Sequence, residues 1–406
     1  MAEIVAMSTP AALERRLGYA GPALFSYGFR PFFLGAALWS ALGIGLWIPQ
    51  YLGLFALPTA MTPVDWHVHE MLFGYVAAAV AGFLLTAIPN WTGRLPISGW
   101  PLAGLAALWL AGRLALLFSG RIGLPLAASV DVLFLLVLAL AAGREIVAGR
   151  NWRNLRVLAL LTLLIAANIV FHAEILWRGS AVYGTRFGIA AIIGLLMLIG
   201  GRIVPSFTRN WLARRGPGRM PAVFSRFDAI AMAASGVALA GWVLQPDHVV
   251  VGVLMIASAI LQAVRLGRWA GERTFADRLV LVLHIAYAFI PLGFLLTACA
   301  ILHPEWVPAS AGIHAWTAGA IGLMPLAVMT RATLGHTGQA LAASPGTQAV
   351  YAAAALGALL RIAAAITGSM LLIELAAVAW VAAFAGYALL YGPLLVRRPP
   401  IWANRC

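Results

Sequence analysis

The chain has 406 residues, of which 63% are hydrophobic and only 10% are charged, and its mean hydropathy is +0.93. A soluble globule could not cover so many apolar residues with a polar shell, so this class is excluded. The formal net charge is +14, but the basic residues form no continuous soluble face, and nucleic acid is not expected as a partner. Apolar runs of about 20 residues, each able to cross a bilayer core of roughly 30 Å, recur along the chain.

These runs predict an all-α fold, a polytopic transmembrane helical bundle of about twelve spans in the lipid bilayer. We expect one integral membrane domain over residues 1–406, with a segment 1–31 before the bundle, the bundle at 32–395 and a tail at 396–406. The longest predicted loop, 205–227, is too short for a further domain. The predicted spans are 32–50, 67–89, 101–119, 122–143, 155–176, 183–204, 228–245, 248–266, 279–301, 313–331, 347–367 and 370–395.

The arginines give this bundle a direction. If the N-terminus faces the cytoplasm, 22 of the 27 basic residues fall in cytoplasmic segments, and only Arg121 and Arg178 fall in outer loops. The remaining three, Arg113, Arg186 and Arg361, lie within spans. Cytoplasmic loops of membrane proteins carry an excess of arginine and lysine, so both termini are predicted to be cytoplasmic.

Several histidines are candidate metal ligands, because imidazole is the commonest ligand of haem iron and also binds copper. With this orientation, four lie toward the outer side of the membrane, at the start of the second span, in the fifth span and at the start of the tenth. Two more lie toward the cytoplasm, one in the ninth span and one in the loop LGHTG after the tenth. In chain order the six are His67, His69, His172, His284, His314 and His336.

Ionisable side chains in the outer halves of several spans predict one shared polar site, since a charge in hydrocarbon normally faces the bundle interior with a partner. Glu70 and Glu174 are candidate proton-handling groups there. Arg113 and Arg361 are candidates for contacts to haem propionates, because guanidinium binds carboxylates through two parallel hydrogen bonds. Alternatively, the two arginines form structural ion pairs with acids of the spans, which are Asp131, Glu174 and Glu374.

Helical geometry constrains the pair His67 and His69, which lie about 200° apart around a regular helix. Either His67 precedes the helix, or the two histidines serve different partners. Glu70, three residues after His67, could orient that ring, and Asn168, one turn before His172, could do the same there. Each histidine could instead be a structural group held by hydrogen bonds.

Five strings of the sequence resemble those of the NnrS family of bacterial membrane proteins. They are GFRPFFL at 28–34, HVHEMLFGY at 67–75, GFLLTAIPNWTGR at 82–94, GRIVPSFTRN at 201–210 and MTRATLGHTG at 329–338. The resemblance implies a twelve-span protein of the bacterial inner membrane that contains haem, expected to be type b, and copper. It also implies a role in denitrification and in relief of nitric oxide stress, and it favours His67, His69, His314 and His336 as site residues.

The first functional hypothesis is therefore a haem- and copper-containing redox protein that binds or reduces nitric oxide or an iron-nitrosyl species, with an unidentified electron donor. Whether the protein is an enzyme stays open, with a redox enzyme favoured. The alternative is a twelve-span secondary transporter of a small anion or a metal–nitrosyl species. A third possibility is a structural role in assembling another denitrification complex.

Overall fold

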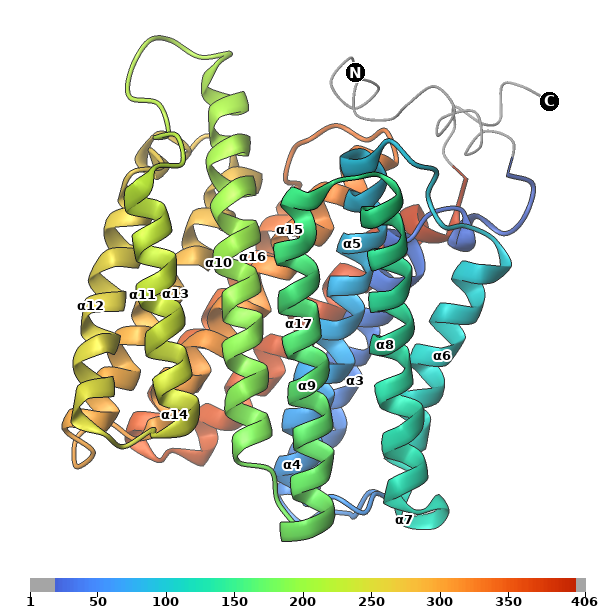
Figure 1. The fold of residues 1–406 in the computed structure, drawn as a ribbon, viewed down its shortest axis with the longest axis vertical. Coiled ribbons are helices and arrows are strands. Elements are labelled where there is room, and N and C mark those ends of the chain that lie inside the picture. Colours follow the sequence, from blue (N-terminus) through green and yellow to red (C-terminus); the bar gives the residue numbers. More distant parts are fainter. Residues whose placement is uncertain (1–18, 399–406) are drawn as a thin grey trace. The chain divides into compact units, whose positions relative to one another are not determined.

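The computed structural model describes residues 19–398, and within this range the chain forms helices and loops without a strand (Figure 1). Twelve helical segments are long and apolar enough to cross a membrane, which confirms the predicted all-α polytopic fold. They are α3 (Phe29–Tyr51), α4 to α5 (Pro63–Thr92), α6 (Trp100–Leu117), α8 (Leu124–Ala148), η3 with α9 (Trp152–Arg178), α10 (Tyr183–Leu212), α11 (Arg226–Leu244), α12 (Val249–Gly267), α13 (Arg278–Leu302), α14 to α15 (Ala309–His336), α16 (Pro345–Thr367) and α17 (Met370–Val396).

Contacts between Cα atoms divide the chain into two compact units. Unit 1 comprises Met1–Thr185, Met329–Leu341 and Phe384–Cys406, and unit 2 comprises Arg186–Val328 and Ala342–Ala383. Unit 1 therefore contains α3 to α9 and the ends of α15 and α17, whereas unit 2 contains most of α10, then α11 to α14 and α16.

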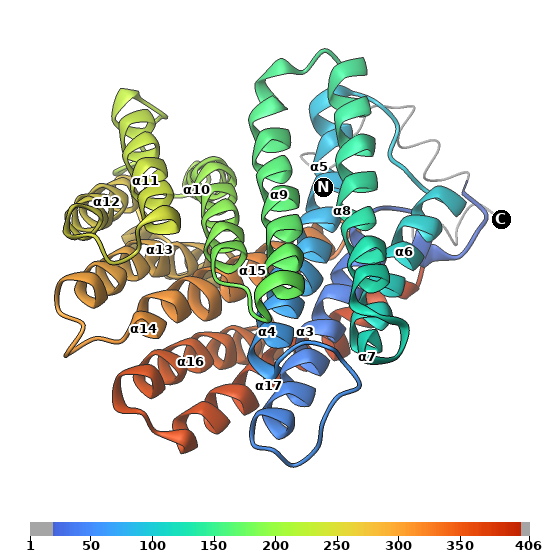
Figure 2. The ribbon, with the colours of Figure 1, turned by 60° about the horizontal axis from the view of Figure 1, so that its bottom comes forward.

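In unit 1, α8 packs between α6 and α9 and also contacts α5, which in turn packs on α3 (Figure 2). Gly112 on α6 permits a close approach to α8, because a Cβ atom at Gly112 would lie 3.2 Å from the Cα atom of Asp131. Small residues commonly allow such close packing between membrane helices. The close approach positions two charged side chains, since Asp131 on α8 and Arg113, the residue after Gly112 on α6, are both buried at this contact.

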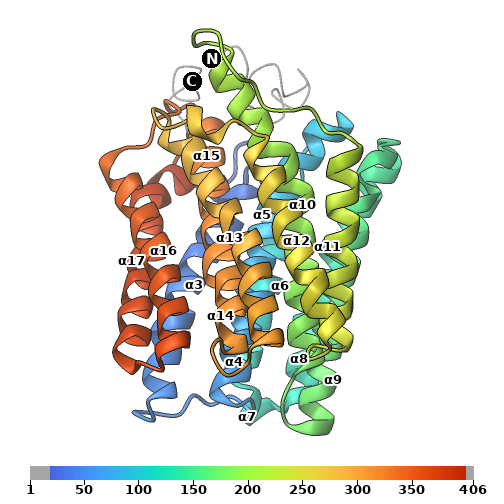
Figure 3. The same cartoon turned by 90° about the vertical axis from the view of Figure 1, so that its left-hand side faces the viewer.

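In unit 2, α13 packs against α12, α14 and the segment that follows α14, while α11 packs on α12 (Figure 3). Gly293 on α13 receives the indole of Trp316, because a Cβ atom at Gly293 would lie only 2.1 Å from Cδ1 of that ring. The Trp316 Nε1–H donates to the carbonyl of Ile290 at 3.1 Å. Helix α16 packs on α14, so α14 has packing partners on both α13 and α16.

Several helix ends differ from the sequence prediction, and three of them bear on the candidate residues or the longest loop. The second span begins at Pro63, where the Thr62 side chain accepts the Asp65 N–H at 3.1 Å, so His67 and His69 are both helical. Helix α10 continues past the predicted residue 204 to Leu212, and α15 continues to His336, which was expected in a loop. Hydropathy marks the end of an apolar run, whereas backbone hydrogen bonds continue the helix into the polar interface.

Two spans contain a π-helical segment directly after a histidine. Segment η2 (Glu70–Tyr75) follows His69 in unit 1, and η5 (Ala315–Ile321) follows His314 in unit 2. A π-helical turn holds an additional residue and changes the direction of the side chains around it, and such turns are frequent at functional sites. Both histidines thus lie at positions where the helix changes its winding.

Candidate metal centre

Three buried side chains from three helices of unit 1 converge on one point. Nε2 of His69 on α4 lies 3.1 Å from Oδ2 of Asp131 on α8, and Nε2 of His172 on α9 lies 3.0 Å from the same oxygen. One ligand atom from each of the three residues lies within 4.8 Å of the other two. Two imidazoles and a carboxylate in this arrangement could hold a metal ion.

Asp131 is fixed by partners from two neighbouring helices. Arg113 on α6 forms an ion pair with Oδ1, and Asn168 on α9 donates its Nδ2–H to Oδ2 at 2.8 Å. The Arg113 guanidinium also contacts Oε2 of Glu70 at 2.8 Å, and it is only 1% exposed. One guanidinium thus joins two buried carboxylates, which a group with several N–H donors in a rigid plane can do.

Glu70 holds the other side of the His69 ring. Its Oε1 lies 3.1 Å from Nδ1 of His69, and its Oε2 accepts the indole N–H of Trp39 at 2.6 Å. Gly74, within η2, provides space for these groups, because a Cβ atom there would lie 2.7 Å from Nη1 of Arg113 and 2.8 Å from Oε2 of Glu70. A carboxylate on the far nitrogen of a histidine is the usual device that fixes the ring of a metal ligand.

The charges of this cluster do not balance among its own side chains. Glu70 and Asp131 contribute two negative charges, Arg113 contributes one positive charge, and His69 and His172 are neutral unless protonated. All are buried, and an uncompensated charge in a membrane protein interior costs several kcal/mol. A cation bound between His69, Asp131 and His172 would restore neutrality.

His172 faces the cluster with one ring nitrogen only. Its Nε2 contacts Asp131, while its Nδ1 is buried and has no hydrogen-bond partner among the described residues. An ion held at Nε2 would not contact Nδ1, because the two ring nitrogens point in different directions. The charge of the cluster is therefore the observation that fits a cation there.

The structure brings together only part of the predicted site set. His69, His172, Glu70 and Arg113 meet around Asp131, which the sequence indicated only as an ion-pair partner. Arg113 forms the ion pair with Asp131 that the alternative interpretation named, and a second one with Glu70 that it did not name. Two predictions about orientation need correction: Glu70 contacts His69 where His67 was expected, and Asn168 contacts Asp131 and His69 where His172 was expected.

The remaining candidates of unit 1 have other surroundings. His67 stacks on Trp47, with ring centroids 4.0 Å apart, so the two histidines of HVH have different partners. The carboxylate of Glu174 accepts the backbone N–H groups of residues 182, 183 and 184, the last at 2.7 Å, and thereby caps the start of α10. The ring of His336 packs beside Tyr27 and Phe29, with centroids 5.5 and 5.4 Å away.

The other candidates lie in unit 2. Nδ1 of His314 contacts the carbonyl oxygen of Ser310 at 2.6 Å, and His314 is the last residue of α14, which packs on the helix that contains Arg361. Nε2 of His284 on α13 contacts the hydroxyl of Thr208 at 2.8 Å.

Residues 23–398 of the chain match the protein-family model described as NnrS protein. The chain belongs to the NnrS family. This is a metal-binding family, and the buried His69–Asp131–His172 group of this NnrS protein could bind a metal. No curated protein and no solved structure matches the chain. Twelve apolar helices agree with a multi-pass membrane protein.

The sequence indicated Asp131 only as an ion-pair partner and Asn168 only as an orienting group, and it placed neither among the candidate ligands. Each is a polar residue within an otherwise apolar span, and such residues normally face the bundle interior. Asn168 precedes His172 by one helical turn, so both project from the same face of α9 toward Asp131. The polar residues within the fourth and fifth spans were therefore the sequence signal that could have identified Asp131 and Asn168 as members of the centre.

Proposed function

We propose that this NnrS protein is a haem- and copper-containing protein of the bacterial inner membrane that binds nitric oxide, with copper held by His69, Asp131 and His172. The supporting observation is the buried convergence of these three side chains with one unbalanced negative charge. Imidazole nitrogen suits copper, and the carboxylate lowers the charge of a divalent ion. Bound copper would supply a redox-active centre.

The surrounding residues prepare His69 for this role. With a metal bound at Nε2 of His69, Glu70 would accept the Nδ1–H of the neutral imidazole and so fix the orientation of the ring. Arg113 forms ion pairs with both carboxylates and fixes their positions. Glu70 is the stronger candidate for proton handling, because the oxygens of Glu174 already accept backbone N–H groups.

We propose that haem binds elsewhere than at this cluster. Nε2 of His69 is only 3.1 Å from Asp131 and 3.2 Å from Asn168, which is a spacing for a single ion and leaves no room for a porphyrin. Among the other histidines, His314 would hold the haem iron best, since the carbonyl of Ser310 contacts Nδ1 and would leave Nε2 for the iron. Arg361, on the helix that packs on α14, is the proposed propionate contact. The proposed site set otherwise keeps His67, His284 and His336 as weaker candidates.

Metal analysis and optical spectroscopy of the purified protein test this assignment. Copper per chain is measured for the wild type, His69→Ala, His172→Ala and Asp131→Asn, and a reduced-minus-oxidised spectrum is recorded for each. We expect each substitution to remove copper and to leave the haem bands. His314→Ala should show the reverse, with loss of the haem bands and retention of copper.

His303→Ala is the matched control, because His303 lies in an exposed loop beside Glu305 and should change neither cofactor. Copper retained in both His69→Ala and His172→Ala would contradict the proposed centre. A colourless and metal-free wild-type protein that transports a small anion would favour the transporter alternative. Nitric oxide consumption with an artificial electron donor then distinguishes turnover from binding.

A further inference from the structure

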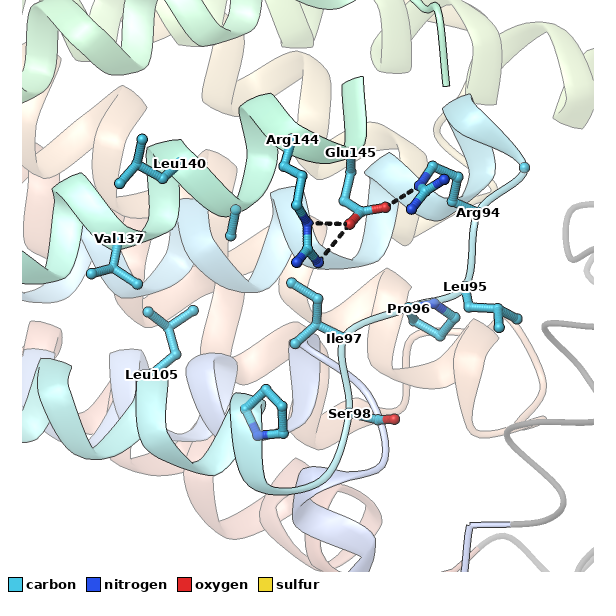
Figure 4. A pocket seen from close by; sticks show the side chains of 13 residues that line it. Arg94, Leu95, Pro96, Ile97, Ser98, Leu105, Val137, Leu140, Arg144 and Glu145 are labelled. Carbon is cyan, nitrogen blue, oxygen red and sulfur yellow. Dashed lines mark hydrogen bonds and ion pairs between the residues drawn. The ribbon is translucent and has the colours of Figure 1, made fainter. Parts of the chain in front are cut away.

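A cavity at the far end of α8 lies outside the metal centre. It has a volume of about 800 Å³ and is lined by the 93–98 segment after α5, the start of α6 and the last turns of α8, all within unit 1 (Figure 4). Glu145, in this cavity, follows Asp131 by 14 residues on α8, which corresponds to roughly 21 Å along the helix axis. The cavity and the metal centre are therefore separate sites.

The polar end of the cavity carries an excess of positive charge. Arg94 and Arg144 both form ion pairs with the carboxylate of Glu145, which is 9% exposed, and Figure 4 shows the two guanidinium groups on either side of it. The arginine side chains are themselves 44% and 69% exposed. Two cations share one anion here, so the three side chains keep a net charge of +1, and each guanidinium has N–H groups beyond those that contact Glu145.

The rest of the cavity is apolar and continues along the membrane-facing side of α8. Val137 and Leu140 lie two turns and one turn before Arg144 on the same face, and Leu105 of α6 contributes the opposite wall. Leu140 is 73% exposed, so in a membrane this wall is open to lipid. From Arg144 to Val137 the groove extends roughly 10 Å toward the bilayer centre.

We propose that this groove binds an anionic phospholipid. The phosphate diester of the headgroup would lie beside Glu145 and contact N–H groups of Arg94 and Arg144, and one acyl chain would follow Leu105, Val137 and Leu140 into the bilayer. Arginine pairs bind phosphate oxygens through charge-assisted hydrogen bonds, and the cytoplasmic leaflet, where the arginine distribution predicts this end of α8, is the anionic one.

Charge complementarity selects this occupant over other amphiphiles. A neutral quinol would leave the net positive charge of Arg94, Arg144 and Glu145 uncompensated, and a zwitterionic lipid would bring a third cation close to the two arginines. A free phosphate ion would satisfy the arginines but leave the apolar groove unfilled. Only a ligand with one negative headgroup and an apolar chain matches both ends of the cavity.

Native mass spectrometry of the purified full chain tests the proposal. Binding of phosphatidylglycerol is compared with binding of phosphatidylcholine that has the same acyl chains, for the wild type, Arg94→Gln, Arg144→Gln and the double variant. A basic residue near an anionic headgroup changes affinity by about fivefold, so each single variant should lose about that factor for phosphatidylglycerol and the double variant more. Arg156→Gln, an exposed arginine at the start of α9 outside the cavity, is the control and should bind as the wild type does.

Glu145→Gln distinguishes ligand binding from a structural role of the ion pairs. This variant removes the carboxylate that competes for both arginines, so phosphatidylglycerol should bind more tightly, whereas loss of fold would weaken binding of every lipid. Equal binding of the two lipids by the wild type would overturn the proposal. Displacement of phosphatidylglycerol by inorganic phosphate alone would replace it with a simple phosphate site, and displacement by a soluble quinol analogue would replace it with a quinol site.

Discussion

Replacing Arg113 by glutamine removes the only cation among the described charged side chains that contact Glu70 and Asp131. All three side chains are at most 1% exposed, so solvent cannot screen the two carboxylates that remain. Breaking a buried ion pair by removal of one partner costs roughly 3–5 kcal/mol of unfolding free energy. Hydrogen bonds from Trp39 and Asn168 still reach the carboxylates, so we expect a loss of about 3 kcal/mol in the free energy of unfolding, the lower end of that range.

Unfolding by denaturant in mixed micelles measures this loss, with Arg219→Gln as the control. Arg219 forms a two-bond ion pair with Glu272, but both side chains are more than half exposed, and such a pair contributes about 0–1 kcal/mol. The loss of unfolding free energy for Arg113→Lys should lie between the losses for Arg113→Gln and Arg219→Gln, because an ammonium group replaces the planar guanidinium poorly at a site with two carboxylates. If Arg113→Gln loses no more stability than Arg219→Gln, the buried charges do not hold the centre together.

Three further predictions concern the same unit. Gly74→Ala should lower the free energy of unfolding by about 1–3 kcal/mol and reduce bound metal, because its Cβ atom would displace Arg113 and Glu70 from their ion pair. Gly45→Ala, with open space around it, should be neutral or stabilising. Thermal unfolding with metal analysis checks both variants. Glu174→Ala should cost about 1–2 kcal/mol through loss of the α10 cap and leave metal content unchanged, so a loss of metal there would contradict the capping role. Added copper should raise the unfolding temperature of the wild type and leave that of Asp131→Asn nearly unchanged, since a ligand stabilises only a protein that binds it.

The composition of the chain was sufficient for the fold class. Runs of about 20 apolar residues specify helices because backbone groups in hydrocarbon must be hydrogen-bonded within the segment. All twelve predicted spans correspond to helices of the structure. The errors lie at helix ends such as Leu212 and His336, where interface residues continue the helix after the hydropathy has fallen.

The histidines show where sequence reasoning stopped. Spacing separated His67 from His69 correctly, since residues two apart on a helix face different directions, and the structure gives them different neighbours. Spacing could not show that η2 begins at Glu70, and the winding of this segment places Glu70 beside His69. The sequence prediction assumed a regular helix in this span, so the rare π-helical segment was not predicted.

The sequence by itself determined that the chain is a helical membrane protein, which residues in its spans are polar, and which family it resembles. The tertiary structure decided which of those polar residues meet. Asp131 lies 62 residues after His69 and 41 before His172, and it joins them because α8 packs against both α5 and α9. Helix periodicity fixes directions within one element, whereas a site made from three helices depends on packing between them, which local sequence does not encode.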